Sequence, residues 1–209
     1  MKDRRELLQL RTFKYSKSMY IKNIILQTIL ETKIEIPDRE NFIHLQFRRF
    51  AGCPVCNLHL QSFARRQQQV TEAGIREVIV FHSTREELLK YTSGFPFDLV
   101  ADPKKQLYKN YGVESSLWAI ADPSAFISII IGIVNSTLEF LLGKRPLPSF
   151  RPGGGSLGLP ADFLIAPDGK IIDCHYGHHA DDHWSVEELL QIAAVAKQTK
   201  NKKLINQLR

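Results

Sequence analysis

The sequence predicts an α/β fold in which helices cover a mixed β-sheet. Between residues 33 and 112, short β-rich runs alternate with segments of helical period, a pattern typical of layered α/β domains. Near the C-terminus, residues 161–176 predict a strand, a tight turn and an antiparallel return strand. At 209 residues, the chain has the length of one well-filled domain.

The individual elements follow from spacing and from turn residues. Helices are expected where apolar residues recur every three or four positions, and strands where β-branched residues alternate or cluster. Gly74 and Gly112 follow helical runs as C-caps, and Ser185 with Glu188 forms a capping box. In chain order, we expect a helix over 17–31, strands over 33–36 and 41–47, a helix over 58–73, a strand over 77–81, a helix starting at 83–87, a strand over 97–100, a helix over 104–111, strands over 161–165 and 170–176, and a helix over 185–196.

An apolar segment interrupts this rhythm over residues 115–150. Residues 125–134 form the most apolar stretch of the chain, and polar residues from Asn135 to Glu139 end it. It stops short of the roughly 20 residues that span a bilayer, so the sequence predicts no membrane association. We expect a helical insertion that packs over the sheet or forms an interface, which makes a homodimer one possible assembly.

The positive charge is concentrated at the two ends. The net charge is +6, with six Lys or Arg and two acids in residues 1–18, and five cations without an acid in residues 197–209. Those ends sum to +9, which leaves about −3 for the middle of the chain. Because the cations lie in tails, the pattern predicts solvated ends, with 198–209 as a basic tail, and no nucleic-acid interface.

Two cysteines stand where a strand ends and a helix begins, in the motif Cys53-Pro54-Val55-Cys56. A helix N-terminus stabilises a thiolate, which is the nucleophile in disulfide exchange and peroxide reduction. We therefore expect Cys53 to attack and Cys56, one turn on, to close a disulfide. The pKa of Cys53 should lie below its ordinary value of about 8.5, with Arg48 or Arg49 adding positive charge.

Other interpretations of the cysteines stay open. A zinc site needs two further ligands, but there is no second CxxC and Cys174 is isolated. Residues 175–183 contain several His and Asp residues, yet a loop and helix cap account for them as well as a metal does. Both cysteines could also be inert packing residues. Three further histidines are expected to be packing or surface residues: His44, His59 and His82.

Cysteine usage also bears on location. Three cysteines are too few for a disulfide framework, so the pair is expected to act in a reducing compartment. The N-terminus leads into no secretory signal. Together these observations predict a cytoplasmic protein.

The order of strand, Cys53–Cys56 motif, helix and strand resembles the thioredoxin-like superfamily. The later run 158–165, followed by Asp168-Gly169-Lys170-Ile171, adds to this resemblance. Within the superfamily, the chain looks like the peroxiredoxin-like branch of the alkyl hydroperoxide reductase and thiol-specific antioxidant family. The resemblance implies a thioredoxin-like domain over 33–197, after an N-terminal helical extension over 1–32. It also implies a cis bond before Pro160, with that proline against the cysteines.

The chain departs from the family pattern around the cysteines. Typical members carry Pro and Thr seven and three residues before the reactive cysteine, where this chain has Gln46 and Phe50. They also carry an Arg near the final hairpin, which is absent from residues 159–163. Arg48 or Arg49 is the candidate replacement for that charge.

These features predict a thiol-dependent oxidoreductase and antioxidant that uses a redox-active Cys53–Cys56 disulfide. Its substrate would be a peroxide or a disulfide, an external thiol would reduce it, and neither a metal nor an organic cofactor is implied. The alternative is a non-catalytic interaction protein that keeps the fold and uses the apolar insertion to bind a partner.

Overall fold

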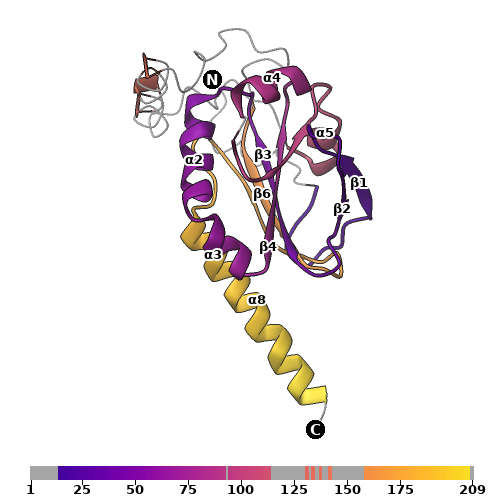
Figure 1. The fold of residues 1–209 in the computed structure, drawn as a ribbon. Coiled ribbons are helices and arrows are strands. Elements are labelled where there is room, and N and C mark those ends of the chain that lie inside the picture. The colour runs from indigo at the N-terminus through magenta and orange to yellow at the C-terminus, as the bar shows by residue number, and fades with distance from the viewer. Residues whose placement is uncertain are drawn as a thin grey trace, which may run out of the picture.

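A computed structural model describes residues 14–92, 94–113 and 158–207, together with residues 130, 131, 133, 134, 137, 141 and 142 of the insertion. The fold is the predicted α/β arrangement, with a twisted sheet between helices (Figure 1). The predicted strands at 41–47, 77–81, 97–100, 161–165 and 170–176 are all present, with ends shifted by one or two residues.

The central sheet is mixed, with the strand order β5-β4-β3-β6-β7. Strands β3, β4 and β5 run parallel, β6 is antiparallel to β3, and β7 is antiparallel to β6. Strand β3 therefore lies at the centre, and its carboxyl end leads into the cysteine motif. The bounds are β3 (Phe42–Arg48), β4 (Ile75–Phe81), β5 (Asp98–Ala101), β6 (Ala161–Ile165) and β7 (Ile171–Tyr176).

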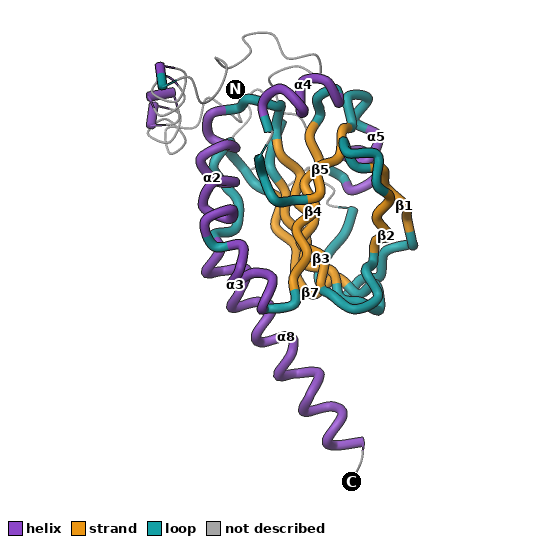
Figure 2. The backbone as a smooth tube through the Cα atoms, in the orientation of Figure 1, coloured by secondary structure: helices purple, strands orange, loops and turns teal. Residues whose placement is uncertain are grey.

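Helices lie on both sides of the sheet (Figures 1 and 2). On one side, α2 (Pro54–Arg65), α3 (Gln67–Glu72) and the first turns of α8 (Val186–Gln207) share a core that includes Phe63, Val70 and Leu189. Leu88 of α4 (Arg85–Tyr91) adds to this side through a second cluster. On the other side, Tyr108 and Tyr111 of α5 (Gln106–Tyr111) pack on the sheet.

The helix expected over 58–73 needs a small change, and the helix caps are confirmed. The helix expected over 58–73 begins earlier, at Pro54, and breaks at Arg66, whose φ of −114° is not helical. Thr84 caps α4 through a capping box with Glu87. Ser185 accepts from the backbone N–H of Glu188 at 3.2 Å, as its sequence position predicts.

The helix predicted over residues 17–31 is wrong. Strands β1 (Ile24–Gln27) and β2 (Lys33–Ile36) pair there as an antiparallel hairpin. Isoleucine is stiff at χ1 and suits a pleated surface, so the β-branched residues favour strands over a helix. The side chains of Leu26, Ile34 and Ile36 pack into the core beside α5. The hairpin crosses the boundary expected at residue 32, so the described part of 1–32 is not a helical extension.

The helix α8 replaces the expected basic tail at 198–209. It continues to Gln207 and runs well beyond the body of the domain (Figure 1). The segment 186–207 contains no Gly or Pro, which allows one helix to continue through the lysines.

The described part of the insertion is helical and exposed. Six of its aliphatic side chains are between 46% and 73% exposed, so they do not pack over the sheet: Ile130, Ile131, Ile133, Val134, Leu141 and Leu142. The remaining residues of 114–157 lie outside the described part. Within the described residues, no helix is both long and apolar enough to cross a membrane.

Candidate thiol site

The loop between β3 and α2 places the two cysteines. Cys53 is the N-cap of α2, with extended backbone angles, and Pro54 occupies the first helical position. Gly52 has a φ of +77°, and a Cβ at this position would lie 3.0 Å from the Tyr91 ring. The backbone N–H of Ala51 donates to Ser83 Oγ at 2.9 Å, which ties the loop to the end of β4. A side chain at Gly52 would therefore displace the loop that holds Cys53.

The two thiols are reduced and buried, and a hydrogen bond joins them. Cys53 and Cys56 are 1% and 3% exposed, and neither forms a disulfide. Burial of Cys53 opposes its ionisation, but the hydrogen bond with Cys56, the charge of Arg49 and two backbone N–H groups of α2 outweigh it and lower the pKa of Cys53 to about 6. The hydrogen bond to the Cys53 thiolate, followed by burial, raises the pKa of Cys56. The pair therefore holds one proton near neutral pH, on Cys56.

The neighbouring residues Arg48 and Arg49 have different surroundings, since Arg48 is the last residue of β3 and Arg49 lies just after the strand. Arg49 is 5% exposed, and its charge favours the thiolate of Cys53. Arg48 instead donates to Asp162 at 2.5 Å and to His59 at 2.9 Å. The charge of Arg49 therefore acts on Cys53, whereas the guanidinium of Arg48 is bonded to a different group of residues.

Three further residues line the region beside the thiols, and the sequence did not single out two of them. The Tyr108 hydroxyl donates to the Val80 carbonyl at 2.9 Å, and burial, together with the nearby Cys56, raises the pKa of Tyr108. The ring of His82 lies 5.6 Å from that of Tyr108. A Cβ on Gly158 would lie 2.9 Å from Nε2 of His82 and 3.7 Å from Cγ of Arg49.

A signal for one of these three residues was present in the sequence. His82 directly follows the strand predicted over 77–81, and in a parallel pair of strands this carboxyl end lies at the same edge as the cysteine loop. The histidine was interpreted as a packing or surface residue, and it is in fact fully buried.

The prediction of a cis bond before Pro160 is wrong. Among the described residues, the cis peptide bond joins Ile36 and Pro37, and the Leu159–Pro160 bond is trans. Pro160 instead extends the pairing of β6 with β7, since its carbonyl accepts from the backbone N–H of Gly177 at 2.9 Å. A Cβ on Gly177 would lie 2.7 Å from Cγ of Pro160, so the proline is packed against that glycine.

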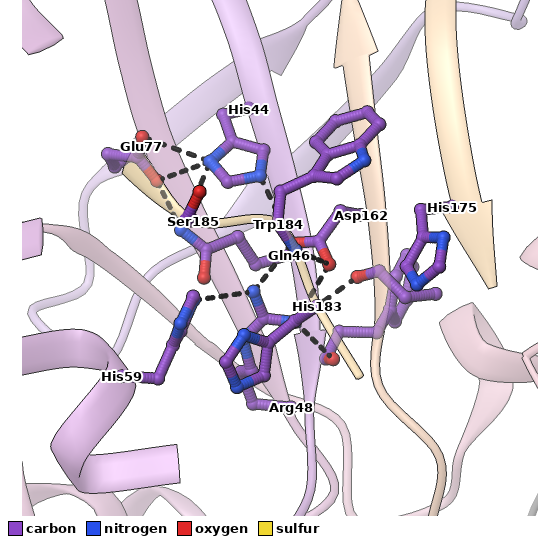
Figure 3. Close-up of polar contacts among 12 residues, drawn as sticks. His44, Gln46, Arg48, His59, Glu77, Asp162, His175, His183, Trp184 and Ser185 are labelled. Carbon is purple, nitrogen blue, oxygen red and sulfur yellow. Dashed lines mark hydrogen bonds and ion pairs between the residues drawn. The ribbon is translucent and has the colours of Figure 1, made fainter. Parts of the chain in front are cut away.

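A group of four charged side chains is buried between the sheet and α2, and we call it the buried ion cluster: His44, Arg48, Glu77 and Asp162 (Figure 3). Nδ1 of His44 lies 2.9 Å from Glu77, and Nε2 lies 3.1 Å from Asp162. Carboxylates only accept, so both ring nitrogens donate and the ring is an imidazolium. Although burial opposes this charge, Glu77 and Asp162 raise the pKa of His44 to about 9. The four charges therefore balance.

Contacts with α2 and the loop before α8 complete the surroundings of this cluster. Since an Arg has no acceptor, Nε2 of His59 must accept the hydrogen bond from Arg48. Burial, with the charges of His183 and Arg48, lowers the pKa of His59, so this ring is neutral. Its centroid lies 3.6 Å from that of His183.

The segment 175–183 forms local pairs. His175 lies 2.7 Å from Asp182, and His183 lies 3.1 Å from Asp181. Asp182 also accepts from the backbone N–H of His178 at 2.7 Å. In the parts of the chain that the structure describes, no group of three or more His, Cys, Asp or Glu side chains is arranged to hold a metal ion.

Comparisons with known structures show the same fold. A peroxidoxin BcpB from Mycobacterium tuberculosis has a TM-score of 0.60 and 14% identity, covering 86% of this chain and 97% of that one. A 2-Cys peroxiredoxin from Plasmodium vivax, in reduced form, has a TM-score of 0.59 and 12% identity, covering 90% and 84%. A putative thiol:disulfide interchange protein DsbE from Chlorobium tepidum has a TM-score of 0.54 and 18% identity, covering 88% and 98%.

Sequence comparison adds a relative and a family. A curated protein from Takifugu rubripes, Peroxiredoxin-like 2C, is 23% identical over 152 residues, which are 68% of this chain and 66% of that protein. The AhpC/TSA antioxidant enzyme family matches residues 62–181, more than half of the chain. The matched region begins after Cys53 and Cys56, so their assignment depends on the geometry of the site. The fold and this match agree, and the chain belongs to the AhpC/TSA antioxidant enzyme family.

Proposed function

We propose that the protein is a thiol peroxidase whose nucleophile is Cys53 and whose resolving thiol is Cys56. The observation that carries this proposal is the pairing of one acidified thiol with one protonated thiol at a helix N-terminus. The Cys53 thiolate can attack a peroxide, and the protonated Cys56 thiol can then attack the oxidised Cys53 and supply a proton to the leaving group.

The reaction balances with these two groups. The Cys53 thiolate attacks the terminal oxygen of a hydroperoxide, forming an S–O bond while the O–O bond breaks, and the leaving alkoxide takes a proton from solvent. Cys56 then attacks the sulfenic acid, forming the S–S bond, and its proton leaves with the hydroxyl group as water. Two equivalents of an external thiol reduce the disulfide and restore the site.

Arg49 supplies the positive charge that the altered family pattern lacks. Gln46 and Phe50 replace the usual Pro and Thr, and residues 159–163 offer no Arg. The Arg49 charge favours the thiolate, and it would also favour negative charge on the departing oxygen. We assign Arg49 to this role and remove Arg48 from it.

Burial of the sulfurs favours a small peroxide over a protein disulfide. Phe50 and Val55 pack with the two cysteines in one apolar cluster. Exchange with a protein disulfide requires the thiolate to reach a sulfur on another chain, which a residue 1% exposed cannot do without local opening.

Hydrogen peroxide consumption with dithiothreitol as reductant tests this proposal. Cys53→Ser should abolish turnover, because no other described thiol has a lowered pKa. Cys56→Ser should still consume one equivalent and leave a sulfenic acid that dimedone traps. Arg49→Gln should raise the pKa of Cys53 by about one unit and slow its alkylation at neutral pH several-fold.

Arg39→Gln is the matched control for Arg49→Gln, since its side chain is 89% exposed and lies away from the cysteines. Unchanged peroxide consumption in Cys53→Ser would refute the proposal. So would a wild-type Cys53 that titrates at its ordinary value.

The alternative, a non-catalytic protein that binds a partner through the insertion, is favoured by the exposed aliphatic residues at 130–142. A second copy of the chain is the simplest partner. Ile130→Asp should then shift the protein to a smaller size in size-exclusion chromatography. Val195→Asp is the control, because Val195 is also an exposed apolar residue but lies on α8. An unchanged elution volume for Ile130→Asp would exclude this self-association.

A further inference from the structure

The buried ion cluster contacts the helix that carries the thiols. His59 lies three residues after Cys56, and both side chains belong to the buried face of α2. The Arg48 guanidinium reaches from β3 to His59 on α2 and to Asp162 on β6 (Figure 3). The side chain of Arg48 thus joins α2 to strands β3 and β6.

Stability alone does not explain this buried, charged contact, because burying charges costs free energy. Removing charges from water costs several kcal/mol per ion, and apolar residues of similar volume often stabilise a core at least as well. A buried hydrogen bond adds specificity of orientation, because the donor and the acceptor meet in only one arrangement of the two elements that carry them. Apolar packing alone, as between Phe63 and its neighbours, would permit α2 to shift along the sheet.

Arg48 is also fixed through its backbone, on the side of the thiols. Its carbonyl shares the single hydrogen of the Tyr108 hydroxyl with the Val80 carbonyl, and Tyr108 lies beside Cys56. The His183 ring contacts the His59 ring with the two planes tilted by 45°, which leaves the His59 ring little freedom. The first turns of α2 are therefore held through His59, by Arg48 from the sheet and by His183 from the loop before α8.

We propose that Arg48 and His59 are positioning residues for the thiol reaction: their hydrogen bond holds the first turns of α2 in the one placement that keeps Cys53 beside Arg49 and beside the backbone N–H groups of Val55 and Cys56. This inference rests on the proposed function of Cys53, and it adds two residues that do not touch the sulfurs. Their effect passes through the position of α2.

A pair of His59 variants tests the inference. His59→Phe keeps a ring of similar size and removes the acceptor, whereas His59→Gln keeps an acceptor oxygen. The readouts are the thiolate absorbance of Cys53 against pH and the equilibrium of the Cys53–Cys56 disulfide with glutathione. A less well placed helix stabilises the thiolate less, so the reduced form loses stability relative to the disulfide.

For His59→Phe, we expect the pKa of Cys53 to rise by about one unit and the equilibrium to move toward the disulfide by roughly fivefold. His59→Gln should stay within about twofold of wild type. The inference is overturned if His59→Phe lowers only the unfolding free energy and leaves both thiol readouts unchanged. It is also overturned if the two variants shift both readouts equally.

Arg48→Lys provides a second test that does not depend on His59→Phe folding. Lysine keeps a positive charge beside Asp162, but it lacks the planar guanidinium that donates to Asp162 and His59 at the same time. It should shift both thiol readouts in the same direction as His59→Phe, and an unchanged Cys53 titration would overturn the inference. Neither readout needs peroxide turnover. Shifted readouts in a protein without peroxidase activity would therefore support positioning while refuting the proposed function.

Discussion

The two faces of strand β3 are built on different principles. Ile43, Leu45 and Phe47 face α5 and the β1–β2 hairpin, where every neighbour in the core cluster is apolar or aromatic. The alternate residues, His44, Gln46 and Arg48, face α2 and α8, and each is fully buried among polar partners. An alternating strand usually has one face in water. Here, polarity marks a second interior, so alternation by itself does not identify the solvent side.

The two faces also differ in how they tolerate change. The Phe47 ring contacts three aromatic rings at centroid distances of 5.0 to 5.8 Å, and apolar contacts of this kind can readjust. On the other face, Asp162 accepts from both His44 and Arg48. Losing one member there leaves one net charge in the interior without a counter-charge. The polar face should therefore be the more fragile one.

The largest expected effect comes from Asp162→Asn, which keeps the shape of the side chain and removes its charge. Two buried cations then lose their shared partner, and breaking such a group costs about 3–5 kcal/mol of unfolding free energy. Phe47→Leu, an apolar change on the opposite face of the sheet, should cost about 1.5 kcal/mol or less. Urea unfolding at pH 7 with both cysteines reduced measures both values.

A double variant sharpens this comparison. Arg48→Met with Asp162→Leu removes an opposite pair together, so it should recover part of the loss seen in Asp162→Asn. If Asp162→Asn is no more costly than Phe47→Leu, the two faces are equivalent and the contrast between them fails.

Most of the fold follows from local sequence signals. The strands at 41–47 and 77–81 and the caps at Thr84 and Ser185 depend on neighbouring residues, so spacing and turn chemistry predict them. The placement of Cys53 at a helix start follows from the same signals. The prediction of a helix over 17–31 fails because the isoleucines are compatible with the spacing of a helix and also with that of a strand. Pairing with residues 33–36 decides in favour of strands.

The buried ion cluster could not be predicted in this way. Its contacts join residues that are far apart in the chain, since His44 is 33 positions from Glu77 and 118 from Asp162. A lone histidine in a strand carries no sign of either partner. The different tasks of Arg48 and Arg49 have the same origin, because the sequence shows two adjacent cations and only the sheet shows which side each faces. The thiols themselves were predictable because they lie together in one motif.

The pH dependence of the unfolding free energy distinguishes the polar face from the thiol site. Raising the pH removes the contribution of His44 but adds the contribution of Cys53. The pKa of His44 is raised to about 9 from 6.5, so its contribution is complete below pH 6.5 and is lost as the pH rises through 9. The pKa of Cys53 is lowered to about 6, so its contribution is present above pH 8.5 and is lost as the pH falls through 6. Between these limits, the effects of the two groups partly cancel.

Replacing all three cysteines by serine isolates the His44 effect. In that background, the unfolding free energy should fall by roughly 3 kcal/mol between pH 6.5 and pH 9.5, since each pKa unit corresponds to about 1.4 kcal/mol. His44→Gln in the same background is the control. It should be less stable at low pH and show a shallower fall, with a remaining slope from His175, whose pKa Asp182 also raises. Equal slopes with and without His44 would mean that the ring is a neutral imidazole in the folded protein. The polar face of β3 would then be held by neutral hydrogen bonds around a single Arg48–Asp162 pair.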